Sequence, residues 1–191
     1  DFKVTTDFGT RRIAKAAFDY AKYNGWDHRK QILCDMINFE AFDIFGSQEV
    51  RKVQLDEMLA MLPDYDYIGV GRDGGDKGEF CPIFYRRDVL EKLDGGTFWL
   101  SDTPNQVSYG WDAECRRVCS WGYFKDKLTK KKFWFFNTHM DHRGKVARVE
   151  GAKLLLNKIK QMCKPGATII LTGDFNVAQG SAPYNTIAQS G

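Results

Sequence analysis

Three apolar runs that each end in a group of polar residues constrain the possible fold of this chain more than any other feature. The last run covers residues 169–171, and its β-branched side chains predict a buried strand that stops at Gly173. Asp174 and Asn176 follow that glycine, and alternation along an extended backbone places both on one side of the chain. A carboxylate and an amide at a strand exit suit a site for a metal or a phosphate. Taken alone, the same residues are more often an Asx turn.

The other two runs have the same form. Residues 42–45 lead past a glycine to Gln48 and Glu49, and residues 133–136 lead into Asn137-Thr138-His139. Three predicted strands therefore end in side chains of the kind that bind metal ions and phosphate groups.

Gln48-Glu49, Asn137-Thr138-His139 and Gly173-Asp174-Phe175-Asn176, in this order, resemble motifs of the endonuclease/exonuclease/phosphatase superfamily, which has the pancreatic-DNase-like fold. Each motif is weak alone, and the ordered set carries the resemblance. It implies an α/β (α+β) protein with a four-layer α-β-β-α sandwich, in which two mixed, largely antiparallel sheets are flanked by helices. It also implies metal-dependent hydrolysis of a phosphate ester.

The resemblance gives each motif residue an expected role. Glu49 is expected to be the main ligand of Mg²⁺ (or Mn²⁺), with Gln48 beside it, since magnesium needs only one or two carboxylates besides water. Asp174 would orient or deprotonate the attacking water, and Asn176 would donate hydrogen bonds to the charged pentacovalent state. His139 would contact the phosphate and relay a proton.

Further candidates lie outside the three motifs. Glu79 stands where DNase-like members place an acid that partners the catalytic histidine. Arg143 is a candidate for phosphate contact, because a guanidinium suits bidentate recognition of phosphate. Arg51 matches a position that can reach a nucleic-acid backbone. Arg116 and Arg117 flank a predicted strand, and alternation predicts that only one of them faces the cleft.

Simpler interpretations of these side chains remain open. Glu49 could be an acid in the first turn of the next helix, stabilised by the helix dipole. His139 could be a buried histidine satisfied by a backbone carbonyl. Asp141 and His142 could be a solvated loop pair, and the remaining charged candidates could be ordinary surface charges.

Hydrophobic periodicity predicts alternating helices and strands, with a hairpin that implies a mixed sheet. Helices are expected over residues 11–23, 27–39, 53–62, 145–162 and 182–189, and strands over 2–4, 42–46, 65–70, 80–86, 96–100, 117–124 and 132–137. Residues 89–93 are expected to be helical or a turn. We expect one domain over residues 1–191, incomplete at its C-terminus, because the family's closing Ser-Asp-His motif is not found. No residue matches the family's first-strand asparagine.

Composition excludes several classes of protein. Apolar residues make up 43% and aromatic residues 14% of the 191 residues, as in a packed globular domain. A net charge of +3 creates no global field toward nucleic acid. No apolar run approaches the ~20 residues that a membrane span needs. The five cysteines are odd in number and include no CxxC pair, so neither a disulfide framework nor a zinc knuckle is indicated.

The sequence favours a magnesium-dependent phosphoesterase. Its substrate would be a phosphodiester or a phosphomonoester: nucleic acid, a nucleotide, a lipid or inositol phosphate, or another small ester. The alternative is a non-catalytic binding module or an inactive fragment that retains the fold, which the two missing motifs support. A module of that kind has no need to keep Glu49, His139, Asp174 and Asn176 together. The oligomeric state stays open, as does the compartment, cytoplasmic or exported after loss of a signal peptide.

Overall fold

The computed structural model describes residues 25–190, so the predicted strand over residues 2–4 and helix over residues 11–23 lie outside the described part. The elements follow one another as α2 (Trp26–Glu40), β1 (Ile44–Gly46), α3 (Lys52–Met61), β2 (Tyr65–Ile68), β3 (Ile83–Arg86), β4 (Leu90–Trp99), β5 (Val118–Asp126), β6 (Lys132–His139), α4 (Lys145–Met162), β7 (Thr168–Asp174) and α5 (Ala182–Ala188). None of these helices is long and apolar enough to cross a membrane.

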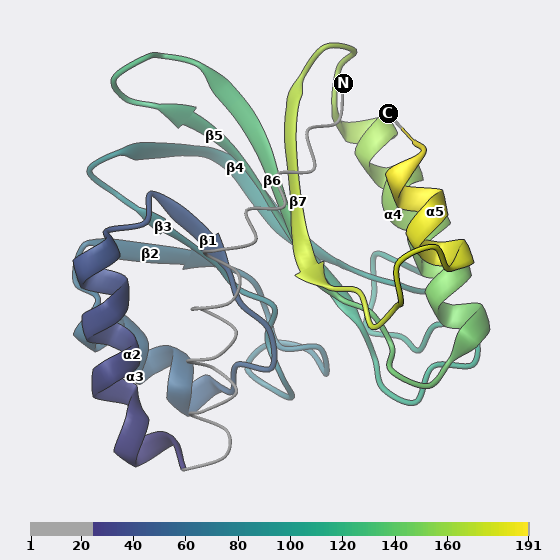
Figure 1. The fold of residues 1–191 in the computed structure, drawn as a ribbon, viewed down its shortest axis with the longest axis horizontal. Helices are drawn as coiled ribbons and strands as arrows, with labels where there is room; N and C mark the ends of the chain where they lie inside the picture. Colours follow the sequence, from purple (N-terminus) through teal and green to yellow (C-terminus); the bar gives the residue numbers. More distant parts are fainter. Residues whose placement is uncertain (1–24, 191) are drawn as a thin grey trace.

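The first sheet is antiparallel and has the order β1-β3-β2. Helices α2 and α3 cover its outer face (Figure 1). Leu33 and Ile37 of α2 and Leu55 and Met58 of α3 form one buried cluster with Phe84 of β3. These helices form here because their apolar residues recur at helical spacing and have a sheet face to cover.

The second sheet has the order β4-β5-β6-β7. Its pairs are antiparallel except β6 with β7, which is parallel because the chain crosses over through α4 between these strands. Leu155 and Ile159 of α4 pack against Phe136 of β6, and α5 lies beside α4 on the same outer face (Figure 1). The crossover brings the ends of β6 and β7 to the same edge of the sheet.

The inner faces of the two sheets share a third apolar cluster. Ile68 and Ile83 come from the first sheet, and Phe124 and Phe135 from the second. Alternation along β6 turns Phe135 toward the opposite sheet and Phe136 toward α4. The predicted four-layer α-β-β-α sandwich, with two mixed, largely antiparallel sheets flanked by helices, is confirmed.

The prediction of a helix or turn over residues 89–93 holds only for Val89, which lies in a turn, and is wrong for residues 90–93. These four residues belong to β4, in which Leu90 pairs with Asp126 and a bulge separates Lys92 from Asp94. Backbone pairing along the whole of β5 overrides the weak strand propensity of the charged residues and glycines in this segment. The strand predicted to begin at residue 80 begins at Ile83 instead.

Candidate active site

The three polar strand ends meet at one edge of the sandwich. Parallel pairing sets His139 at the end of β6 opposite Asp174 at the end of β7. Gln48, two residues beyond β1, reaches the same place, because its Nε2 donates a hydrogen bond to Asn137 Oδ1 at 2.7 Å. Segments far apart in the sequence are thus joined where the resemblance expects a site.

Asn137 links these strand ends through hydrogen bonds. It is fully buried, and its side chain makes four hydrogen bonds: from Nδ2 to Ser47 O (2.8 Å) and Pro82 O (3.0 Å), and to Oδ1 from Gln48 Nε2 (2.7 Å) and Thr172 Oγ1 (3.0 Å). An asparagine side chain has two N–H donors and one carbonyl oxygen with two lone pairs, so these four bonds use its full hydrogen-bonding capacity. The residue therefore fixes the loop after β1 and the segment before β3 against the second sheet.

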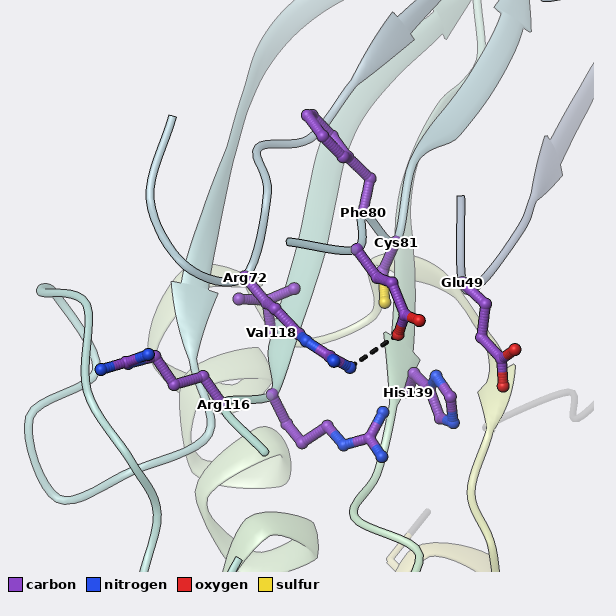
Figure 2. A pocket seen from close by; sticks show the side chains of 9 residues that line it. Glu49, Arg72, Phe80, Cys81, Arg116, Val118 and His139 are labelled. Carbon is purple, nitrogen blue, oxygen red and sulfur yellow. Dashed lines mark hydrogen bonds and ion pairs between the residues drawn. The ribbon is translucent and has the colours of Figure 1, made fainter. Parts of the chain in front are cut away.

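A pocket opens beside these strand ends. Its walls are built by Glu49, Arg72, Glu79, Phe80, Cys81, Arg116, Arg117, Val118 and His139. Figure 2 shows Glu49 and His139 on one side of it, with Arg72 extending toward them from the other. The pocket thus combines three arginines with two carboxylates and an imidazole.

Glu49 holds an unusual backbone conformation at the pocket. Its φ is 60°, in the left-handed region that non-glycine residues adopt at a cost of about 1–2 kcal/mol. Helix α3 begins only at Lys52, after the N-cap residue Arg51, so Glu49 is not an acid of the first helical turn. The next residue, Val50, bridges to Phe80 and so holds Glu49 at the pocket.

Glu79 is joined to Arg72, a residue that sequence reasoning missed. Arg72 Nη1 donates to Glu79 Oε2 at 2.6 Å, and the backbone N of Arg72 donates to Glu79 O at 3.0 Å. Trp99 Nε1 in turn donates to Arg72 O at 2.8 Å. Residues 72–78 resemble an ordinary glycine-rich turn in sequence, so no local pattern indicates that Arg72 contacts Glu79.

His139 is 5% exposed and belongs to the pocket wall. Its pKa is lowered to about 4, chiefly by burial and also by the positive charge of Arg117, and the carboxylates of Asp174 and Glu49 oppose this shift. The imidazole is therefore neutral near pH 7 and can donate only one hydrogen bond.

Asp174, the last residue of β7, forms an Asx turn with Asn176. Asn176 N donates to Asp174 Oδ1 at 2.9 Å, and Asn176 Nδ2 donates to Met140 O at 2.9 Å. Asn176 has a left-handed φ of 48°. Asp174 is not part of the pocket wall formed by the residues above, although its charge acts on His139.

The predicted substrate-binding arginines occupy different places. Arg116 and Arg117 both line the pocket. Alternation does not decide which of them faces it, because β5 begins only at Val118 and both residues lie in the loop before it. Arg116 Nη1 donates to Asp73 Oδ1 at 3.0 Å, and the Arg116 side chain extends away from His139 in Figure 2.

Arg143 and Arg51 do not line the pocket. The Arg143 side chain is 74% exposed, and its Nε lies 2.8 Å from Glu114 Oε2. Arg51 is exposed at the start of α3, where its backbone N donates to Gln54 Oε1 at 2.8 Å.

Asp141 is not the solvated loop residue that a simpler interpretation allowed, since it is only 2% exposed. Its oxygens accept four backbone N–H groups, from Arg143 (2.9 Å), Gly144 (2.7 Å), Glu114 (3.1 Å) and Cys115 (3.2 Å). Burial favours the neutral acid, but these hydrogen bonds outweigh it and hold the pKa of Asp141 well below its ordinary value. Asp141 therefore organises the loop that follows β6.

The donors near the pocket fit magnesium better than zinc. Within residues 25–190, no group of three or more histidine, cysteine, aspartate and glutamate side chains gathers as a metal cage. Magnesium needs only one or two carboxylates, and Glu49 supplies one at the pocket wall. Cys81 also lines the pocket, and burial raises the pKa of its thiol to about 12.

Known proteins share this fold and much of this sequence. A mannosyl-6-phosphatase of Bacteroides thetaiotaomicron is 50% identical, with a TM-score of 0.85 over 91% of this chain and 66% of its own. An uncharacterized protein of Acanthamoeba polyphaga mimivirus is 33% identical over 159 residues, which is 79% of this chain and 59% of that protein.

The human nocturnin catalytic domain, solved with a bound sulfate anion, has the same fold. It is 18% identical, with a TM-score of 0.72 over 86% of this chain and 61% of its own. The chain spans 59% to 66% of the length of these three relatives. The model of the endonuclease/exonuclease/phosphatase family matches residues 16–191, and the chain belongs to that family.

Proposed function

We propose that this protein hydrolyses a phosphate ester by metal-assisted attack of water, and that its substrate is a phosphomonoester on a sugar. The observation that carries the proposal is the convergence of Glu49, His139 and two arginines, Arg72 and Arg117, on one pocket. A phosphomonoester dianion needs both charge neutralisation and oriented donors, and guanidinium groups supply both.

Magnesium, when bound, would neutralise phosphate charge and lower the pKa of a coordinated water. Glu49 would hold the magnesium ion. The amide oxygen of Gln48 would lie beside the ion, because the amide nitrogen Nε2 already donates to Asn137. The partly buried bond to Asn137 keeps the Gln48 amide in one orientation.

The groups of this chain would divide the remaining work. Asp174 keeps Oδ2 available to accept a proton from water, since the Asx turn uses Oδ1. Asn176 uses one of its two amide hydrogens on Met140 O, and the other can bind a phosphate oxygen. Neutral His139 can donate one hydrogen bond to the same group.

The sugar monoester is supported by the relative that is a mannosyl-6-phosphatase, which shares half of the aligned residues with this chain. The modest net charge of +3 also gives little attraction for a long polyanion such as duplex DNA.

The test compares hydrolysis of p-nitrophenyl phosphate, bis-p-nitrophenyl phosphate and mannose 6-phosphate in magnesium. We expect both monoesters to turn over at least about tenfold faster than the diester, a difference of about 1.4 kcal/mol in barrier. Faster diester hydrolysis would replace the monoesterase assignment with a nuclease-like one. Phosphate binding without any turnover would favour the non-catalytic binding module.

A further inference from the structure

A chain of polar side chains leads from the surface to the pocket behind Arg117. Glu114 Oε2 lies 3.1 Å from His142 Nε2, and His142 Nδ1 lies 3.0 Å from Arg117 Nη2. Glu114 and His142 are each more than 40% exposed, with side-chain values of 43% and 44%, whereas the Arg117 side chain is 6% exposed. The chain thus connects two solvent-facing groups to a buried guanidinium in the pocket wall.

The chemistry of the guanidinium fixes the direction of these hydrogen bonds. Arginine has only donors, so His142 Nδ1 must accept from Arg117 Nη2. The proton of the neutral imidazole then sits on Nε2 and is donated to Glu114. His142 is therefore held in one tautomer with its acceptor aimed at Arg117.

Asp141 lies on the other side of the same guanidinium. Arg117 Nε lies 3.5 Å from Asp141 Oδ2, too long for a good hydrogen bond, and this buried Nε has no hydrogen-bond partner. Asp141 itself cannot move closer without loss of its four backbone hydrogen bonds. Arg117 Nη1 makes no hydrogen bond to any residue in the part of the chain that the structure describes.

Donor capacity does not separate Arg116 from Arg117, because the Nε of each is buried without a hydrogen-bond partner. The three pocket arginines differ instead in how closely a carboxylate pairs with their positive charge. Arg72 pairs with Glu79 at 2.6 Å, and Arg116 pairs with Asp73 at 3.0 Å and lies 4.3 Å above the ring of Tyr109. Within residues 25–190, the one carboxylate within 4 Å of the Arg117 guanidinium is that of Asp141, at 3.5 Å, and it is shared with four backbone amides. Arg117 therefore has the most to gain from an anionic ligand.

We propose that Arg117 is the arginine that binds the substrate phosphate, and that His142 is a positioning residue that holds its guanidinium toward the pocket. The inference rests on the proposed function, because it names the phosphate contact of that site. The positive charge of Arg117 acts on His139 and Cys81 in the pocket wall, as expected for a guanidinium that faces this space.

His142 contributes by restricting motion. With Nη2 bound to His142, rotation of the guanidinium about its long side chain is limited, and less rotamer freedom is lost when phosphate binds. Asparagine places its Oδ1 near the position of histidine Nδ1, so it can accept the same hydrogen bond. Alanine cannot.

The experiment measures the affinity for inorganic phosphate by calorimetry, and KM and kcat for p-nitrophenyl phosphate, in four variants. We expect Arg117→Ala to weaken phosphate binding about 10- to 100-fold, the range of a hydrogen bond to a charged group. His142→Ala should raise both the phosphate Kd and KM about 3- to 10-fold with little change in kcat. His142→Asn should stay within about twofold of the parent, and exposed His28→Ala is the matched control.

Unchanged phosphate affinity in Arg117→Ala would overturn the assignment of Arg117. Equal defects in His142→Ala and His142→Asn would overturn the positioning role, because a purely structural effect would not be rescued by an acceptor. If Arg117→Ala does not fold, Arg117→Lys replaces it, with an expected loss of about tenfold because lysine lacks the planar fork. Calorimetry measures phosphate affinity independently of turnover. If the variants show the expected affinities but no ester is hydrolysed, the inference about Arg117 is supported and the proposed function fails.

Discussion

Two of the residues at the strand ends, Glu49 and Asn176, adopt left-handed φ angles of 60° and 48°. Such a conformation costs a non-glycine residue about 1–2 kcal/mol, and the surrounding structure must hold it. The bridge from Val50 to Phe80 does so for Glu49, and the bond to Met140 O does so for Asn176. The strain lies at residues for which the resemblance implies roles in metal binding and catalysis.

Asp174→Asn should remove most activity and leave the fold intact. The amide keeps an oxygen for the bond from Asn176 N but cannot take a proton from water. We expect kcat to fall about 10²- to 10⁴-fold, the usual contribution of a general base. The urea midpoint of unfolding is the control and should not move. Turnover within threefold of the parent would remove Asp174 from this role.

The depressed pKa of His139 predicts a loss of stability in acid. The pKa is about 4 in the folded protein and 6.5 in the unfolded chain, so between these values only the unfolded chain binds the proton. The free energy of unfolding therefore falls as pH falls from 6.5 to 4, by on the order of 3 kcal/mol at the lower end.

Urea unfolding of the chelator-treated protein and of His139→Gln at several pH values measures this effect. The free energy of unfolding of the parent minus that of His139→Gln should decrease toward pH 4 and be constant above pH 7. A difference that does not vary over this range would show that His139 ionises normally in the folded state.

At the scale of helices and strands, periodicity predicted most of what the structure shows. α4 spans residues 145–162 as expected, and the β5–β6 hairpin forms across the predicted turn. The start of β4 was not predictable, because Lys92, Asp94 and Gly95 join the sheet through backbone pairing and not through their own preference.

Asn137→Leu should destabilise the protein, although the two side chains have similar volumes. Leucine would remove all four hydrogen bonds of the Asn137 side chain, worth about 0.5–1.5 kcal/mol each. It would also leave the carbonyl of Ser47 without this donor, whereas Pro82 O would keep the bond from Ser47 N. We expect a total loss of about 2–5 kcal/mol in urea unfolding. Asn157→Leu, at an exposed position of α4, is the matched control and should change stability by less than about 0.5 kcal/mol. Equal stability of both variants would show that Asn137 does not join the strand ends.

At the scale of the whole molecule, the site depends on both halves of the sandwich. Glu49, Arg72 and Glu79 come from the half built on the first sheet, and Arg117 and His139 from the half built on the second. The sequence could identify Glu49 and His139, because each lies two or three residues after the end of a predicted strand. It could not identify Arg72 or separate Arg117 from its neighbour, since their places depend on contacts between loops distant in the chain.

The most direct test of the account is the magnesium dependence of p-nitrophenyl phosphate hydrolysis in the parent protein and in Glu49→Gln. We expect chelation to abolish turnover and magnesium to restore it in the parent. Glu49→Gln should need at least about tenfold more magnesium, because the pocket wall loses its carboxylate ligand. Equal turnover in chelator and in magnesium, or an unchanged magnesium requirement in Glu49→Gln, would contradict a metal-dependent phosphoesterase built on this residue.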